Sequence, residues 1–171
     1  MAGSTRTGDD YLAPSFEQFV ADEYGRVLAF ARASTHGWSE AEDLTQEAFL
    51  AAYRKWSEVS RFERPDAFVR RVVANRSVSG VRRRVREAAA VRRLDQSSVI
   101  DTDGLDPAFW AAVGRLPIRQ RHVVALHYLE DRSVADIAAL LDIAEGTVKA
   151  HLHAARHSLA KTLHADIEEE L

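Results

Sequence analysis

The sequence contains no cysteine and no apolar stretch long enough to span a bilayer. Without cysteine the chain can form no disulfide, has no thiol nucleophile and cannot hold a metal through thiolates. The first residues, MAGSTRTGDD, lack the apolar core behind a basic flank that marks a secretion signal. We therefore expect a cytoplasmic protein that does not insert into membranes and owes its stability to packing.

Catalytic motifs are missing as well. The sequence has no phosphate-binding glycine loop, no HExxH motif and no credible serine triad, and its 7 histidines form no plausible site. His153 and His157 are four residues apart, as metal ligands can be, but no third ligand accompanies them. We therefore expect no catalytic residue, no metal and no cofactor, and a protein that is not an enzyme.

Charge is segregated along the chain. The net charge of -3 would by itself argue against a nucleic acid partner. Residues 61–93, however, carry eleven arginines against three acidic residues, whereas acidic residues dominate residues 9–47 and the end of the chain. A polyanion can therefore bind the middle of the chain while the acidic parts face another partner.

The apolar residues predict an all-α fold. They recur at helical rather than alternating spacing, and no Asn-Gly or Asp-Gly turn separates strand-like runs. We expect a first helix from about Ser15 to Thr35 and a second through LTQEAFLAAYRKW, opened by a capping box of Ser39 and Glu42. A third helix is expected to begin near Pro65, after a loop.

The stretch after residue 88 is polar and lacks periodicity, which is typical of a flexible linker between two small helical domains. In the second domain, Asp106 and Pro107 are expected to open a helix, and Leu116-Pro117 to break the chain before the next. The predicted organisation is a disordered tail (1–14), a first domain (15–87), the linker (88–105), a second domain (106–165) and an acidic tail (166–171).

The run SVADIAALLDIAEGTVKAHLHAARHSL, from Ser133, predicts a helix-turn-helix. Ser133 and Asp136 fit an N-terminal capping pattern, and the second helix has an apolar stripe that leaves a cationic, small-residue outer face. The stripe consists of Val148, Leu152, Ala155 and Leu159. A packed helical hairpin with a solvated face fits the same pattern, and Asp142 stands where a DNA-binding turn commonly has glycine.

Two longer stretches resemble a known family. The run from Leu116 to Leu159 resembles region 4 of the bacterial sigma-70 family, with its LP, QR and GTVK elements, although LuxR-type regulators share the TVK.HL part. AEDLTQEAFLAAYRKW, from Ala41, resembles region 2.2 of the extracytoplasmic-function (ECF) sigma factors. RPDAFVRRVVANRSVSGVRRR, from Arg64, resembles their regions 2.3 and 2.4, a block that LuxR-type proteins lack.

The resemblance covers about residues 16–86 and 106–163 and leaves no room for region 1.1 or a sigma-3 domain, which is the ECF arrangement. It implies a sigma factor that directs core RNA polymerase to promoters and assists promoter melting. The implied partners are the clamp helices and β flap of the polymerase, promoter DNA and an anti-sigma factor, and the protein would be at the nucleoid when bound to polymerase. A LuxR-like activator is the alternative.

The resemblance also assigns three surfaces. Polymerase docking would fall on Asp43, Gln46, Glu47, Leu50 and Arg54. The minus-ten element would meet Phe62, Arg70, Arg71, Asn75, Arg76, Arg82, Arg83 and Arg84, because guanidinium groups bind phosphates. The minus-thirty-five element would meet Arg119, Arg121, Thr147, Lys149, His153, Arg156 and His157. For the helical surfaces, solvated faces or a nonspecific RNA-binding arm fit the same residues.

One position departs from the family pattern. Many members carry Asp four residues after the Asn75 position, whereas this chain has Ser79, followed by Gly80. The loop at about residues 57–64 corresponds to the one that captures an unpaired promoter base in the family.

Overall fold

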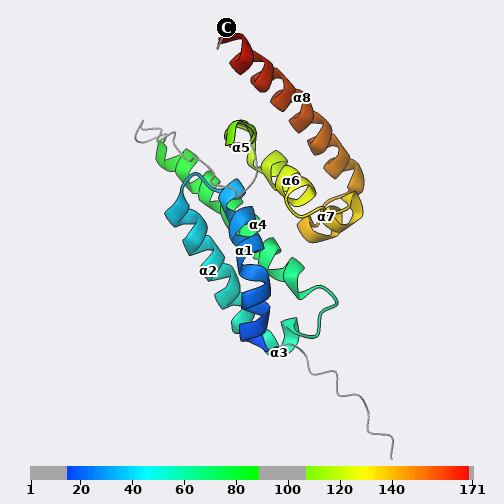
Figure 1. The fold of residues 1–171 in the computed structure, drawn as a ribbon. Coiled ribbons are helices and arrows are strands. Elements are labelled where there is room, and N and C mark those ends of the chain that lie inside the picture. Colours follow the sequence, from blue (N-terminus) through cyan, green and yellow to red (C-terminus); the bar gives the residue numbers. More distant parts are fainter. Residues whose placement is uncertain (1–14, 89–106, 170–171) are drawn as a thin grey trace, which may run out of the picture.

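The computed structural model describes residues 15–88 and 107–169, and in these ranges every regular element is a helix (Figure 1). The prediction of an all-α fold is confirmed. The helices are α1 (Phe16–Ser34), α2 (Trp38–Tyr53), α3 (Trp56–Val59), α4 (Pro65–Ala88), α5 (Pro107–Gly114), α6 (Ile118–Tyr128), α7 (Val134–Leu141) and α8 (Glu145–Glu169). None of the helices described is both long and apolar enough to cross a membrane.

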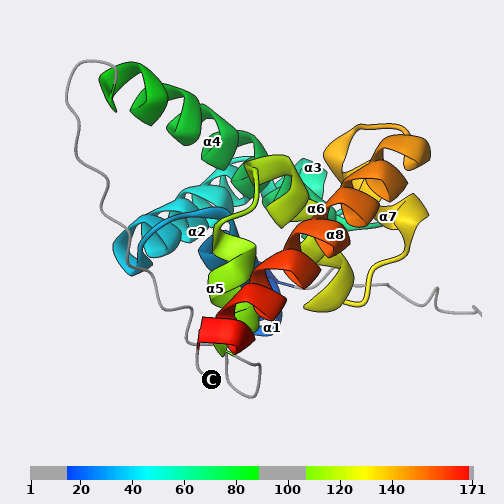
Figure 2. The same cartoon turned by 90° about the horizontal axis from the view of Figure 1, so that it is seen from above.

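Helices α1, α2 and α4 pack against one another as a bundle (Figures 1 and 2). The first helix begins as predicted, because the Ser15 hydroxyl accepts a hydrogen bond from the Gln18 backbone N–H at 3.2 Å. Phe19 of α1 and Phe49 of α2 meet edge to face with ring centroids 5.9 Å apart. The apolar face of α4 is likewise turned inward, with Val69 and Val73 fully buried.

Two details around α2 differ from the prediction. The helix begins at Trp38 with Gly37 at the N-cap, and no side chain caps it, so the predicted capping box of Ser39 and Glu42 is wrong. The second helix also does not continue to Trp56. The chain turns at Lys55 and forms the short helix α3, whose Val59 is fully buried. Burial of this valine favours the break between the two helices. The spacing of apolar residues along the chain does not predict it.

Helices α5 to α8 form a second group, in which α7 and α8 make the predicted helix-turn-helix. The Ser133 hydroxyl accepts a hydrogen bond from the Asp136 N–H at 3.1 Å, as its capping pattern predicted. Asp142 ends α7 in the left-handed conformation, with φ 54° and ψ 53°. The predicted stripe of α8 is buried, with Val148 and Ala155 fully enclosed.

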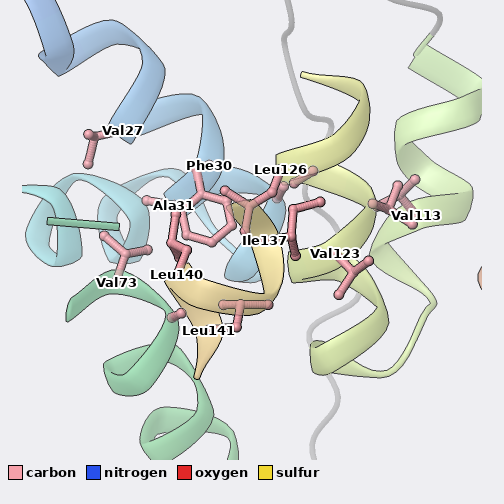
Figure 3. Close-up of a cluster of buried hydrophobic side chains, with 14 of the residues drawn as sticks. Val27, Phe30, Ala31, Val73, Val113, Val123, Leu126, Ile137, Leu140 and Leu141 are labelled. Atoms are coloured by element: carbon pink, nitrogen blue, oxygen red, sulfur yellow. The ribbon is translucent and has the colours of Figure 1, made fainter. Parts of the chain in front are cut away.

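The two groups of helices share one hydrophobic cluster (Figure 3). In the close-up, Phe30 and Ala31 of α1 lie beside Ile137 and Leu140 of α7, and Leu126 of α6 completes the contact. The predicted tail 1–14 and residues 89–105 of the predicted linker lie outside the described residues. Of the predicted acidic tail 166–171, residues 166–169 belong to α8 and the last two lie outside the described ranges.

Candidate polymerase and promoter interfaces

The residues predicted to dock on polymerase lie on the outside of α2. Leu44 and Ala48 fill its inner side, and the helical repeat turns the intervening residues outward. Leu50 is 47% exposed. We call this strip the α2 ridge; it consists of the exposed residues Asp43, Gln46, Glu47, Leu50 and the C-cap Arg54.

An aromatic residue that sequence reasoning missed extends the α2 ridge. Tyr53 is 60% exposed and follows Leu50 by three residues, so both lie on one face of the helix. Its ring is held against Phe16 of α1, with centroids 5.0 Å apart. The spacing of three residues between Leu50 and Tyr53 could have predicted from the sequence that Tyr53 lies on this face.

The loop before α4 presents one aromatic side chain. Phe62 is 42% exposed, and its ring centroid lies 6.3 Å from that of Phe68. Buried Val59 anchors the preceding helix α3. The predicted base-capturing segment is therefore a short structured turn that offers one ring surface.

The outer face of α4 carries Asn75 and Arg76, both exposed as predicted. Arg76 donates a hydrogen bond to Glu47 of the α2 ridge at 2.5 Å, so the two candidate surfaces adjoin. The Ser79 hydroxyl, at the position that departs from the family pattern, donates to the Asn75 carbonyl at 3.1 Å. Arg82, Arg83 and Arg84 follow on the same helix.

Arg70 does not lie on this face. Its side chain is 1% exposed, and its Nε donates to both carboxylate oxygens of Glu130, at 2.6 and 2.7 Å. Its Nη2 donates to Glu23 at 2.7 Å and its Nη1 to the Asp66 carbonyl at 3.0 Å. Arg70 is a structural residue in this arrangement and not the exposed phosphate ligand that the basic block led us to expect. An acidic residue four positions earlier, Asp66, was the only local signal of this role.

Arg71 is exposed, but its guanidinium is engaged by α7. It donates to the carbonyls of Leu140 at 3.0 Å and Ala139 at 2.9 Å. These carbonyls belong to the last turn of α7. Carbonyls there have no N–H partner within the helix, and this end of the helix dipole is negative. The same side chain cannot bind a phosphate while it makes these bonds.

The outer face of the second helix of the helix-turn-helix is open, as predicted. The residues predicted to contact DNA there are all exposed: Thr147, Lys149, His153, Arg156 and His157. Lys149 lies 3.9 Å from Glu145, an exposed pair one turn apart that water screens. This face has the shape and charge of a helix that enters a DNA major groove.

Tyr128 supports the same face and was missed by sequence reasoning. It is 43% exposed, and its hydroxyl accepts a hydrogen bond from Nε of Arg156 at 3.0 Å. The two residues are 28 positions apart, so no local pattern links them. Tyr128 thereby limits the positions that the Arg156 guanidinium can adopt.

Of the two arginines predicted on α6, Arg119 is half-buried and Arg121 is buried, with 3% exposure. Nη1 of Arg121 donates to the carbonyl of Thr35 at the end of α1, at 3.3 Å, and Nη2 lies 3.4 Å from the His36 ring. Arg121 therefore cannot make its predicted contact with the minus-thirty-five DNA element in this arrangement, because its side chain joins α6 to α1.

Five ionisable residues gather where the two groups of helices meet. We call them the junction cluster: Glu23, Asp66, Arg70, Glu130 and Arg132. Arg132 donates to Glu130 at 2.8 Å and to Asp66 at 2.5 Å. Burial tends to raise the pKa of Asp66, but bonding to Arg132 and the charges of Arg132 and Arg70 prevail and lower it. The same partners raise the pKa of Arg132 in spite of its burial.

A neutral histidine lies in the same contact between the two groups. His122 of α6 is fully buried, shares a 2.9 Å hydrogen bond with the Ser77 hydroxyl of α4 and packs against Phe30 of α1. Burial, aided by the positive charges of Arg119 and Arg121, lowers its pKa to about 3. The histidine is therefore uncharged near neutral pH.

Comparison with known proteins decides the family. The family model for Sigma-70 region 2 matches residues 19–87, and the model for Sigma-70, region 4 matches residues 107–159. The RNA polymerase sigma-E factor of Streptomyces avermitilis is 32% identical over 151 residues, which cover 86% of this chain and 84% of the relative. The chain belongs to the sigma-70 family. The ECF RNA polymerase sigma factor SigL of Mycobacterium tuberculosis, also 32% identical over 151 residues, covers 83% of this chain and 85% of its own length.

Solved sigma factors share the fold. The sigma factor RpoE of Bartonella quintana, in complex with the anti-sigma factor NepR, has a TM-score of 0.76 and 26% identity over 88% of this chain and 98% of its own. CnrH, in complex with the cytosolic domain of CnrY, has a TM-score of 0.62 and 25% identity over 88% of each chain.

Together these relatives make the chain an ECF sigma factor, a protein of transcription initiation, as the sequence resemblance implied. The sigma-70 match to residues 19–87 covers the half that a LuxR-type activator does not have. The activator alternative is therefore not supported.

Proposed function

We propose that this ECF sigma factor docks on core RNA polymerase through the α2 ridge. The observation that carries the proposal is the exposure of Leu50 among four polar residues on one helix face, above a fully packed inner side. Burying such a leucine against a partner contributes about 1.5–3 kcal/mol, and the flanking charges fix its orientation. Tyr53 adds an aromatic anchor beside it.

The test is the affinity of the chain for core polymerase. Leu50→Ser removes the apolar contact and is expected to weaken binding by roughly ten- to a hundredfold. Gln18→Ala, on the exposed face of α1, is the matched control and is expected to bind like wild type. If Leu50→Ser binds core polymerase as tightly as wild type does, the α2 ridge is not the docking surface.

The DNA contacts follow from the two other surfaces. The outer face of α4, with Asn75 and Arg76, would hold the minus-ten element together with Arg82, Arg83 and Arg84 of the same helix, while Phe62 would stack on an unpaired base. The outer face of α8 would enter the major groove at the minus-thirty-five element, with Arg156 positioned by Tyr128. Arg70 and Arg121 are left out, because each is buried in a contact between helices.

We assign the two contacts to two domains, residues 15–87 and 106–165, joined by residues 88–105. The separate matches to regions 2 and 4 of the family support this division. The protein would act in the cytoplasm and be associated with the nucleoid when bound to polymerase.

An anti-sigma factor is the regulatory partner we expect. Two sigma factors with this fold were solved with such a protein or with a cytosolic partner domain, NepR and CnrY respectively. A candidate partner should prevent the chain from binding core polymerase and should abolish transcription that depends on it. A partner that leaves both unchanged would not be an anti-sigma factor.

A further inference from the structure

Two histidines lie one turn apart on the outer face of α8. His153 and His157 are both exposed, and with Lys149 they follow one another at intervals of four residues, so the three side chains lie along one side of the helix. We call His153 and His157 the histidine pair. In Figure 1, α6 and α7 lie on one side of α8. The buried stripe through Val148 and Leu152 packs in that direction, which leaves the histidine pair in contact with water.

Neither imidazole of the histidine pair is held by another side chain. Within the part of the chain that the structure describes, no hydrogen bond or ion pair reaches either ring, and no third residue joins them in a group that could hold a metal ion. Of the fixed charges on this face, Lys149 lies 3.9 Å from Glu145, and Arg156 is bonded through Nε to the Tyr128 hydroxyl. Protonation of the pair would therefore add two positive charges beside those of Lys149 and Arg156.

Helices α5, α6 and α7 pack against α8 and contribute few acidic groups. α5 contains no ionisable side chain, and Asp136 of α7 is paired with Arg64 at 3.2 Å. Asp142, which ends α7, is exposed and makes no bond to the histidine pair. The ionisable side chains of α6 are Arg119, Arg121, His122, His127 and Tyr128, of which the Tyr128 hydroxyl is bonded to α8, at Arg156. The charge of the pair is therefore set by pH and by any bound anion.

We propose that the histidine pair makes recognition of the minus-thirty-five element depend on pH, so that the affinity for promoter DNA rises as pH falls from 8 to 6. The inference rests on the proposed function of the outer face of α8 as the minus-thirty-five surface. Imidazole is the side chain that changes its charge between pH 5 and pH 8, and an imidazolium donates hydrogen bonds from both nitrogens. DNA phosphates favour the charged form. Binding therefore takes up protons, and by linkage a lower pH strengthens it.

Promoter binding by the holoenzyme at two pH values tests this inference. Core polymerase carrying the full chain is titrated onto a labelled promoter duplex, identified by run-off transcription, at pH 6.0 and pH 8.0 over a series of salt concentrations. Each phosphate neutralised by a cation adds about 0.9 to the slope of log K against log salt, so two imidazoliums should steepen it by up to about 1.8 at pH 6.0. The affinity should be roughly tenfold higher at pH 6.0. Equal affinities and slopes at the two pH values would overturn the proposal.

Two double variants assign the effect to these residues. His153→Gln with His157→Gln removes both titrating rings, keeps polar side chains that suit a helix, and should lose the tenfold difference between the two pH values. His153→Lys with His157→Lys is charged throughout and should bind at pH 8.0 about as tightly as wild type binds at pH 6.0. His36→Gln removes an exposed histidine outside α8 and is the matched control, which should keep the full difference. Core polymerase and buried His122 are common to all variants, so differences between the variants report on the histidine pair.

The outcomes separate this inference from the proposed function. If the double glutamine variant keeps the wild-type pH difference, the histidine pair is not its source, and the inference is wrong while the sigma function stands. If the double lysine variant binds no better at pH 8.0 than the double glutamine variant, the outer face of α8 does not meet DNA, and the assignment of the minus-thirty-five surface fails with the inference. Run-off transcription by wild type at pH 8.0 reports on the sigma function independently of the pair.

Discussion

Among the arginines of α4, burial decides which are available to a partner. The side chain of Arg76 is 51% exposed and pairs with a residue of the α2 ridge, whereas Arg70, six positions earlier on the same helix, is 1% exposed. A surface ion pair exchanges readily with water and phosphate, but a buried guanidinium released from its carboxylates leaves those charges unpaired. The same residue type is therefore open to a partner at one position and serves packing at the other.

The position of Arg70 could not be predicted from the sequence. Its main partner, Glu130, lies 60 positions away, and only Asp66 is near enough to form a recognisable pair along the helix. Arg121 is a similar case, since it donates to a carbonyl 86 positions away. Contacts of this kind depend on how helix groups meet, which local spacing does not contain.

His122 makes stability depend on pH. Its pKa is about 3 in the folded chain, whereas a histidine in the unfolded chain titrates near 6.5. The unfolded state therefore binds a proton that the folded state does not, and stability is lost as pH falls below about 6.5. The expected loss in free energy of unfolding is about 1.4 kcal/mol per pH unit between pH 6 and pH 4.

Urea unfolding at pH 7.0 and pH 5.5 measures this loss. The charged groups that act on His122 are Arg119 and Arg121 of its own helix, while α1 and α4 face it with Phe30 and Ser77. His122→Gln removes the titrating group and should make the difference between the two pH values about 1.4 kcal/mol smaller than in wild type. An equal difference in both proteins would show that His122 is not the cause.

At the scale of elements, helix starts and apolar stripes could be predicted because they are local. Ser15 and Ser133 cap their helices as expected, and the α8 stripe is buried at the predicted positions. The start of α2 could not be predicted in the same way. A backbone cap at Gly37 replaces the capping box, and the turn into α3 is set by burial of Val59.

The turn of the helix-turn-helix offers an element-scale prediction. Asp142 adopts the left-handed conformation, which costs most residues about 1–2 kcal/mol but is tolerated by Asp and Gly. Asp142→Val should therefore unfold at lower urea than Asp142→Gly, by a free energy of about 1–2 kcal/mol. Equal stability of the two variants would mean that this turn adopts another conformation in solution.

At the scale of the whole molecule, two helix groups that each match a sigma-70 region pack on one another. The family and the exposed faces of α2 and α8 could be predicted from motifs, since those faces depend on spacing within single helices. The packing of the two groups on each other could not be predicted, because it depends on the junction cluster and on a shared apolar contact.

Run-off transcription tests the central claim most directly. Core polymerase should start discrete transcripts on genomic promoter fragments, including the region upstream of the chain's own gene, only when this protein is present. Leu50→Ser should lose these transcripts at protein concentrations where Gln18→Ala retains them. If active protein neither binds core polymerase nor yields transcripts while it still binds duplex DNA by itself, the account is contradicted.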